Sequence, residues 1–169
     1  MWEIGVLISF GLTIVGGYWL AWDELEHVPI KLSRLGQGQA YPLIATGFSL
    51  TGLCLFFHHL SIFGSTHYTL LCGDLLACGI GIVNAKSGWK KRLHSPLVLV
   101  ALSNWIAFLL ISKQDYWTCS EVTFFYIIEH IFSYVNHHFF PNDRLTFCSA
   151  ALCQYLCILS IAPPLLTTT

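Results

Sequence analysis

Five polar or titratable residues recur at helical spacing in a stretch that is otherwise apolar. They are Glu129, His130, Ser133, Asn136 and His137. Their offsets of i, i+1, i+4, i+7 and i+8 put all five on one face of an α-helix. A carboxylate and an imidazole on one face can transfer protons or ligate a metal ion. Because a titratable group in lipid is costly, this face must point into a protein interior or a watery cavity, and a functional site is the default hypothesis for it.

Other titratable side chains in two apolar stretches are candidate partners for this face: His58, His59, His67 and Asp74. We counted depth from the predicted outer membrane boundary at about 1.5 Å per residue. On that count His59 lies about 5 Å deep, Asp74 about 10 Å and His130 about 13 Å. The three residues converge if their helices are neighbours, and they would form a metal site for zinc or iron. Haem is the less favoured cofactor, since the histidine pairs match only loosely in depth.

Such a metal would activate water for attack on a lipid. Glu129 is then the proton shuttle, and Ser133 is the second candidate catalytic residue. The alternative is structural, with Glu129 hydrogen-bonded across helices and His130 a neutral buried histidine that fixes the bundle. The spacing of these residues leaves both alternatives open.

The string Asn-His-His-Phe-Phe-Pro-Asn-Asp at residues 136–143 resembles the last histidine box of membrane fatty-acid desaturases and hydroxylases. In those enzymes paired histidines precede Phe-Pro and help to hold a di-iron centre. The resemblance implies that role for His137 and His138. For the two further boxes of such enzymes, only His27 and His94 are available on the same side.

A second inventory is similar in type to that of the multi-helix lipid hydrolases of the ceramidase and progestin-receptor-like group: His59, Asp74, His130 and Ser133. These hydrolases place histidines, an Asp and a Ser around zinc within a helical bundle. The resemblance implies a zinc-dependent hydrolase site. The chain differs from the group in having no seventh helix and no H-x-x-x-H in its last one.

Composition places these residues in a membrane protein. The chain has 169 residues, of which 55% are hydrophobic and 10% charged, whereas soluble domains carry about 25% charged residues. A net charge of -1 provides no basic field for nucleic acid, which we exclude as a partner.

A bilayer core of about 30 Å requires roughly 20 apolar residues per helix. Six segments approach that length: residues 4–22, 42–63, 67–85, 95–112, 121–140 and 145–162. We therefore predict an all-α, polytopic integral membrane protein, with residues 1–169 forming one compact transmembrane helical domain.

The basic residues predict the orientation. With the N-terminus outside, Lys113 alone falls outside, and the others fall on the cytoplasmic side: Lys31, Arg34, Lys86, Lys90, Lys91, Arg92 and Arg144. This is a positive-inside bias. In the longest loop, residues 23–41, the spacing of apolar residues predicts a short interfacial helix.

Small residues predict where helices approach closely. The third segment carries Gly73, Ala77 and Gly81, and the sixth carries Ser149, Cys153 and Cys157. Four-residue spacing of this kind forms a packing stripe. The cysteines form no C-x-x-C pair, and they are expected to be small packing residues. Cys119 is the exception, because it is predicted to lie in a polar loop.

Three functions are compatible with this sequence. The first is a subunit, assembly factor or small-ligand binder in a membrane complex, with lipids and other membrane-protein subunits as partners. The second is a metal-dependent, lipid-modifying enzyme built on the predicted His59, Asp74 and His130 site. The third is proton or ion conduction through Glu129, His130 and Asp74.

Overall fold

A computed structural model describes residues 2–24, 28–36, 38–83, 88–141 and 143–167. It contains long helices α1 (Trp2–Ala21), α3 (Tyr41–Phe63), α4 (Tyr68–Val83), α5 (Gly88–Phe108), α6 (Tyr116–His138) and α7 (Arg144–Leu166). Shorter elements are η1 (Trp22–Glu24), α2 (Leu32–Leu35) and the π-helical turn η2 (Leu109–Lys113). No strand occurs in these ranges. The all-α prediction is confirmed.

The outer surface of the bundle is apolar. Within the described residues, four helical spans are long and apolar enough to cross a membrane: Trp2–Ala21, Tyr41–Phe63, Leu93–Lys113 and Arg144–Leu166. A shorter apolar helix covers Tyr68–Ile80. On α1, Leu12, Val15 and Trp19 point outward and are largely exposed. Contiguous apolar surface of this kind is rare on soluble monomers, so these faces are compatible with contact to lipid.

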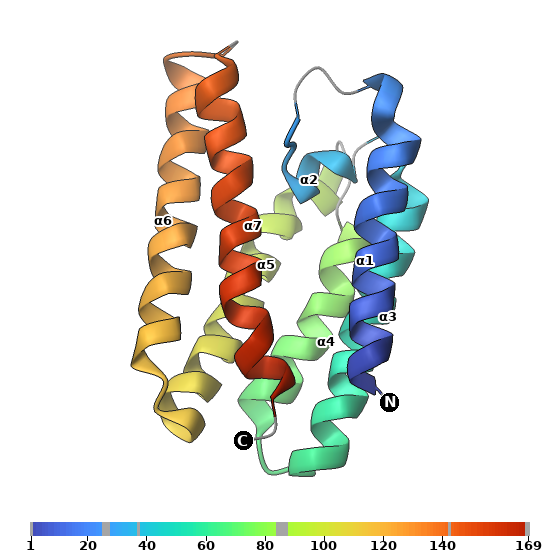
Figure 1. The fold of residues 1–169 in the computed structure, drawn as a ribbon, viewed down its shortest axis with the longest axis vertical. Coiled ribbons are helices and arrows are strands. Elements are labelled where there is room, and N and C mark those ends of the chain that lie inside the picture. The colour runs from blue at the N-terminus through green and yellow to red at the C-terminus, as the bar shows by residue number, and fades with distance from the viewer. Residues whose placement is uncertain (1, 25–27, 37, 84–87, 142, 168–169) are drawn as a thin grey trace.

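The long helices alternate in direction, so that both chain ends lie at the same end of the bundle (Figure 1). The segment with Lys31 and Arg34 and the start of α7 at Arg144 lie toward the opposite end. Lys113, at the end of η2, lies at the end that holds the termini. The predicted separation of basic residues is therefore present among these four. Lys86 lies outside the described residues, and the assignment of the N-terminal end to the outside stays a prediction.

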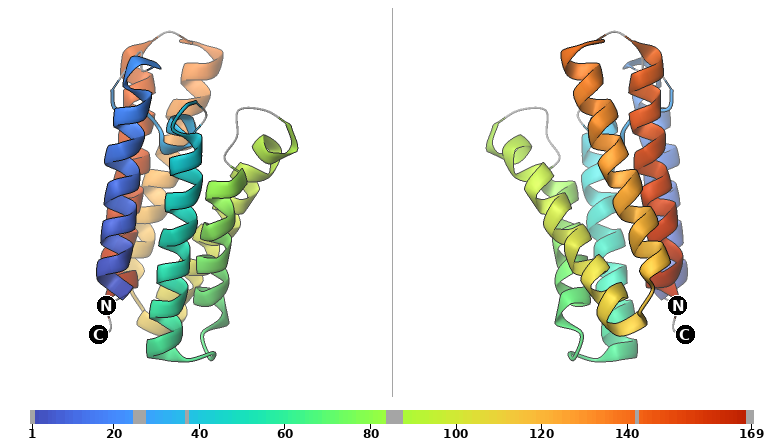
Figure 2. Two further views of the ribbon diagram at one scale, coloured as in Figure 1. Left: turned by 90° about the vertical axis from the view of Figure 1, so that its right-hand side faces the viewer. Right: turned by 90° about the vertical axis from the view of Figure 1, so that its left-hand side faces the viewer.

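Helices that follow one another make the closest contacts. The packed pairs are α1 with α3, α3 with α4, α4 with α5, and α6 with α7. The first four long helices thus form a row, and α6 and α7 form a hairpin beside it (Figure 2). The beginning of α5 leans away from the other helices (Figure 2). The hairpin meets the row mainly through side chains, because few of its backbone positions approach those of the row.

Two glycines permit the closest approaches within the row. A Cβ built at Gly47 of α3 would lie 1.7 Å from Oγ1 of Thr13 on α1. A Cβ at Gly73 of α4 would lie 2.6 Å from the indole of Trp105 on α5. The predicted stripe of the third segment therefore forms a seam with α5 at Gly73. In the last helix, the thiol of Cys157 lies 3.7 Å from the Val122 carbonyl, so that stripe faces α6.

Two helix boundaries differ from prediction. Helix α5 begins at Gly88 rather than at residue 95, so that Pro96 lies inside the helix. Helix α6 begins at Tyr116 rather than at residue 121, because the Asp115 carboxylate caps it by accepting the Thr118 amide at 3.1 Å. The prediction that Cys119 lies in a polar loop is wrong for the same reason, since Cys119 is buried in the first turns of α6.

The predicted interfacial helix in the longest loop corresponds to α2. It is a single turn, and its Leu32 and Leu35 side chains are buried against α1 and α3. Apolar anchoring at both ends of this turn fixes the position of Lys31 just before it. This places a cation from the loop against the interior of the bundle.

Candidate functional site

Glu129 is the centre of a charged cluster on α6. Its Oε1 atom contacts the Nζ atom of Lys31 and accepts the Ser133 hydroxyl at 3.0 Å. Its Oε2 atom lies 2.7 Å from Nδ1 of His130. A buried carboxylate is stable only when paired and hydrogen-bonded. The segment before α2 supplies the cation, and the polar face of α6 supplies the other donors.

His130 is held by Glu129 and by the backbone. Its Nδ1 atom lies 2.9 Å from the Tyr126 carbonyl as well as close to the Glu129 carboxylate. Both neighbours are hydrogen-bond acceptors, so Nδ1 carries a proton. In the cluster the charges of Lys31 and Glu129 balance each other. His130 is not the buried histidine of the structural alternative, because its side chain is 54% exposed.

A second cluster, around His59 and Asp74, is completely buried. The His59 Nδ1 atom lies 2.7 Å from Oδ2 of Asp74, and its Nε2 atom lies 2.7 Å from the Leu165 carbonyl. The Trp105 indole donates to Oδ1 of Asp74 at 3.0 Å. Because a carbonyl only accepts, Nε2 carries a proton, and a second proton lies between Nδ1 and Oδ2. The pair is thus neutral overall, every one of its polar side-chain atoms is engaged, and it ties α3, α4, α5 and α7 together.

The predicted metal site at His59, Asp74 and His130 does not assemble. The structure joins His59 to Asp74 but places His130 in the cluster of Glu129. No group of three His, Cys, Asp or Glu side chains with metal-ligating geometry occurs in the described part of the chain. The physical reason is that His130 lies deeper along its helix than the residue count predicted. Because α6 begins five residues earlier than predicted, His130 lies about 21 Å from the start of its helix rather than about 13 Å.

The structure does bring the two candidate catalytic residues together, because the Ser133 hydroxyl donates a hydrogen bond to the Glu129 carboxylate. Asn136, a further residue of the predicted face, serves the turn between α6 and α7. The Asn136 amide donates to the Phe140 and Asp143 carbonyls and to the Thr146 hydroxyl.

The residues of the histidine box do not form an iron site in the described residues. His137 and His138 are exposed, and their rings contact each other. His94 belongs to α5, and His27 lies outside the described residues. His58 and His67, the other candidate partners, lie near Glu3 and Ser112 respectively.

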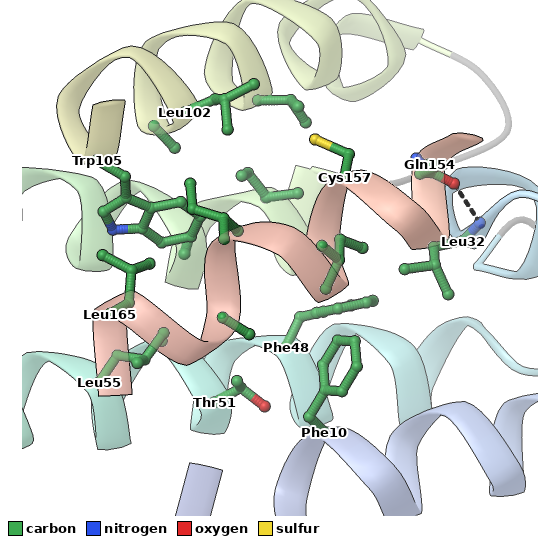
Figure 3. Close-up of a pocket in the computed structure, with 18 of the residues that line it drawn as sticks. Phe10, Leu32, Phe48, Thr51, Leu55, Leu102, Trp105, Gln154, Cys157 and Leu165 are labelled. Carbon is green, nitrogen blue, oxygen red and sulfur yellow. Dashed lines mark hydrogen bonds between the residues drawn. The ribbon is translucent and has the colours of Figure 1, made fainter. Parts of the chain in front are cut away.

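A cavity of about 330 Å³ lies between the helical row and the α6–α7 hairpin. All six long helices contribute to its lining, together with Lys31 and Leu32. Figure 3 shows Trp105, Leu55 and Leu165 at one end of this space and Leu32 with Gln154 at the other. The volume is at the lower limit of the range of about 300–1,000 Å³ that is typical of ligand sites.

The lining of the cavity is graded from polar to apolar. The polar end carries Lys31, His94, Ser95, Glu129, His130 and Gln154. The antiparallel order of the helices explains this grouping. Helices α5 and α7 run toward the end that holds the termini, and their first lining residues are His94 and Gln154. Helix α6 runs the opposite way, and Glu129 is among its last lining residues.

Two polar groups at other levels of the cavity are already engaged. The Thr51 hydroxyl donates to the Gly47 carbonyl, and the Trp105 indole donates to Asp74. Apart from the Tyr126 hydroxyl, the rest of the cavity therefore offers a mainly apolar surface.

Sequence reasoning missed the role of Lys31, which was interpreted only as a topology signal. A usable signal was present, because a buried carboxylate at Glu129 needs a cation and Lys31 lies at the start of the predicted interfacial helix. Gln154 was also missed. It is the one amide in an apolar stretch of α7, and its Oε1 atom accepts the Leu32 amide at 2.8 Å.

Comparison with known proteins supplies no further assignment. The chain matches no protein-family model, no curated protein and no solved structure at a significant level.

Proposed function

We propose that this protein spans the membrane and binds a small amphipathic molecule in the central cavity, alone or as a subunit of a membrane complex. The observation that carries the proposal is the graded lining. An apolar chain fits among Leu55, Leu102 and Leu165, and a polar head fits near Lys31 and Glu129. Burial of apolar surface would drive binding, and the polar end would fix the orientation of the ligand.

The other candidate functions have less support. Every polar side-chain atom of the His59–Asp74 pair is engaged, and both residues are fully buried. A substrate, or a metal ligated by these residues, would have to break bonds that join four helices. Conduction would require a polar path from Asp74 to Glu129, but the lining of the cavity between Trp105 and Glu129 is mainly apolar and includes Leu102, Cys157 and Ile161. These observations favour a binding protein.

Trp105 provides a test, because its indole lines the apolar end of the cavity. We would make a variant in which Trp105 is the only tryptophan, the others being replaced by Phe. The probe is dodecanol with a bromine on its terminal carbon, since bromine quenches indole fluorescence at short range. A matched protein that keeps only Trp19, which is 78% exposed on α1, reports on the bulk membrane.

We expect quenching of Trp105 to saturate as the mole fraction of the probe rises, whereas quenching of Trp19 rises without saturation. Ala162→Phe, which places a ring in the cavity, should weaken the saturable binding by at least about tenfold, which is about 1.4 kcal/mol. Leu159→Phe is the control, because Leu159 is exposed on the same helix. Parallel, unsaturated quenching of Trp105 and Trp19 would show that the cavity binds no amphiphile.

A further inference from the structure

His130 lies where the polar end of the cavity meets the outside of the bundle. It belongs to the lining of the cavity, and its side chain is also 54% exposed. The proton on Nδ1 is held by the Tyr126 carbonyl and the Glu129 carboxylate. No other hydrogen bond of this ring occurs among the described residues. Its second nitrogen, Nε2, is therefore the atom left for a molecule at the mouth of the cavity.

The charges at this end favour an acidic head over a basic one. Both oxygens of the Glu129 carboxylate are already bonded, one by Lys31 and Ser133 and the other by His130. The Lys31 ammonium has three N–H donors. Glu129 and Ser133 are its two acceptors in the described part of the chain. A cationic head would thus meet two basic side chains and no unbonded carboxylate, whereas an anionic head would meet a remaining donor of Lys31.

We infer that the ligand is a single-chain carboxylic acid whose head pairs with Nε2 of His130 and whose chain points toward Trp105. The O–H bond of the acid breaks, and the lone pair of Nε2 takes up the proton as a new N–H bond. Two cations, the ammonium of Lys31 and the imidazolium, then balance two carboxylates, those of Glu129 and the ligand. This inference rests on the proposed function and specifies the class of ligand.

Two features of the mouth make a charged head tolerable there. Because His130 is partly exposed, the head keeps contact with water and is not fully desolvated. The Gln154 amide also belongs to the polar end of the lining, and its oxygen accepts the Leu32 amide. Its nitrogen is thus presented as a further donor for a carboxylate oxygen.

The cavity is long enough for a chain of medium length. On α7 its lining extends from Gln154 to Leu165 (Figure 3), and on α5 it extends from His94 to Trp105. Each stretch covers eleven residue steps, which is about 17 Å at about 1.5 Å per residue. Carbon–carbon bonds of about 1.5 Å advance an extended chain by roughly 1.3 Å per carbon, so about twelve carbons fit. The volume of about 330 Å³ is small for a ligand site and suits one chain rather than the two of a phospholipid.

Three probes with the same terminally brominated chain of about twelve carbons test the inference. They are the carboxylic acid, the alcohol and the permanently cationic trimethylammonium compound. Each is titrated at neutral pH, as a mole fraction of phosphatidylcholine vesicles, into the protein that keeps only Trp105. Charge-assisted hydrogen bonds are about twice as strong as neutral ones, so the acid should bind at least about tenfold more tightly than the alcohol. The trimethylammonium probe should bind more weakly than the alcohol.

His130→Asn separates the head contact from the structural role of His130. The Asn amide can still donate to Glu129 from the position of Nδ1, but it has no atom at the position of Nε2. We expect the affinity for the acid to fall to within about threefold of that for the alcohol, with alcohol binding unchanged. His137→Asn is the matched control, because His137 is exposed on the same helix and does not line the cavity.

Equal affinity for the acid and the alcohol in the parent protein, or a preference for the cationic probe, would overturn the inference about the head and leave the binding function intact. An equal loss of both the acid and the alcohol in His130→Asn would also overturn it, because a purely structural role of His130 gives that result. If no probe gives saturable quenching of Trp105, the proposed function fails as well.

Discussion

Loss of Lys31 should destabilise the bundle more than loss of its partner Glu129. In Lys31→Met, the Glu129 carboxylate stays buried with only Ser133 and His130 as partners. Breaking a buried ion pair costs about 3–5 kcal/mol. Because the Lys31 side chain is 20% exposed, we expect the lower limit, about 3 kcal/mol.

The reverse variant, Glu129→Leu, should cost less. The flexible stem of Lys31 allows its ammonium group to move toward water, so the unpaired charge is relieved. We expect a loss of about 1–2 kcal/mol in the free energy of unfolding. The double variant Lys31→Met/Glu129→Leu replaces the pair by apolar side chains, and such replacements are often close to neutral. The two losses should therefore be far from additive, with a coupling free energy of at least about 2 kcal/mol.

The measurement is reversible unfolding in mixed micelles with a rising fraction of dodecyl sulfate, followed by circular dichroism. Glu121→Leu is the control, since Glu121 lies near the start of the same helix and distant from Lys31. Its effect should add to that of Lys31→Met within about 0.5 kcal/mol. Additive losses for Lys31 and Glu129 would refute the conclusion that this pair is a coupled, buried contact.

Two further predictions concern packing and capping. Gly47→Ala should destabilise the bundle by about 1–3 kcal/mol, because the new Cβ overlaps Thr13. Gly79→Ala is the control, since its new Cβ meets open space and should cause no loss. Equal midpoints of unfolding for both variants would contradict the close approach of α1 and α3. Hydrogen bonds from the Thr146 backbone amide and hydroxyl lower the pKa of Asp143. The stabilisation is therefore present above the ordinary aspartate pKa and is lost as the pH falls through the lowered folded value. Asp143→Asn keeps a capping side chain that does not titrate, so the unfolding midpoint of this variant should no longer include the loss at acid pH that comes from Asp143. An acid profile equal to that of the parent protein would contradict the prediction.

The helices and one of the two clusters could be predicted from sequence because both depend on local information. Apolar runs of suitable length define most of the long helices. The turn at Gly64, where φ is +62°, makes α3 and α4 neighbours. The residue count places His59 and Asp74 within about 5 Å of each other in depth, and on these adjacent helices the two side chains meet.

The placement of His130 could not be predicted by the same count. Residues 116–120 include Thr118 and Ser120 and resemble a loop in composition, yet the Asp115 cap draws them into α6. A shift of five residues moves a side chain about 7.5 Å along a helix. The contact of Lys31 with Glu129 depends on how a loop and a distant helix pack, which no local pattern specifies. The cavity could not be predicted from the sequence for the same reason, because all the long helices together form it.

The division into a helical row and a terminal hairpin has a consequence for biosynthesis. The ribosome completes α1 to α5 before α6 and α7, so Lys31 enters the membrane well before Glu129 exists. During that interval one wall of the cavity is missing, and a lysine lies unpaired beside an apolar slot. This surface stays open to lipid until the hairpin packs against the row. We therefore expect membrane quality-control factors to bind nascent chains that stop before α6, because these chains expose the open wall of the cavity and the unpaired lysine.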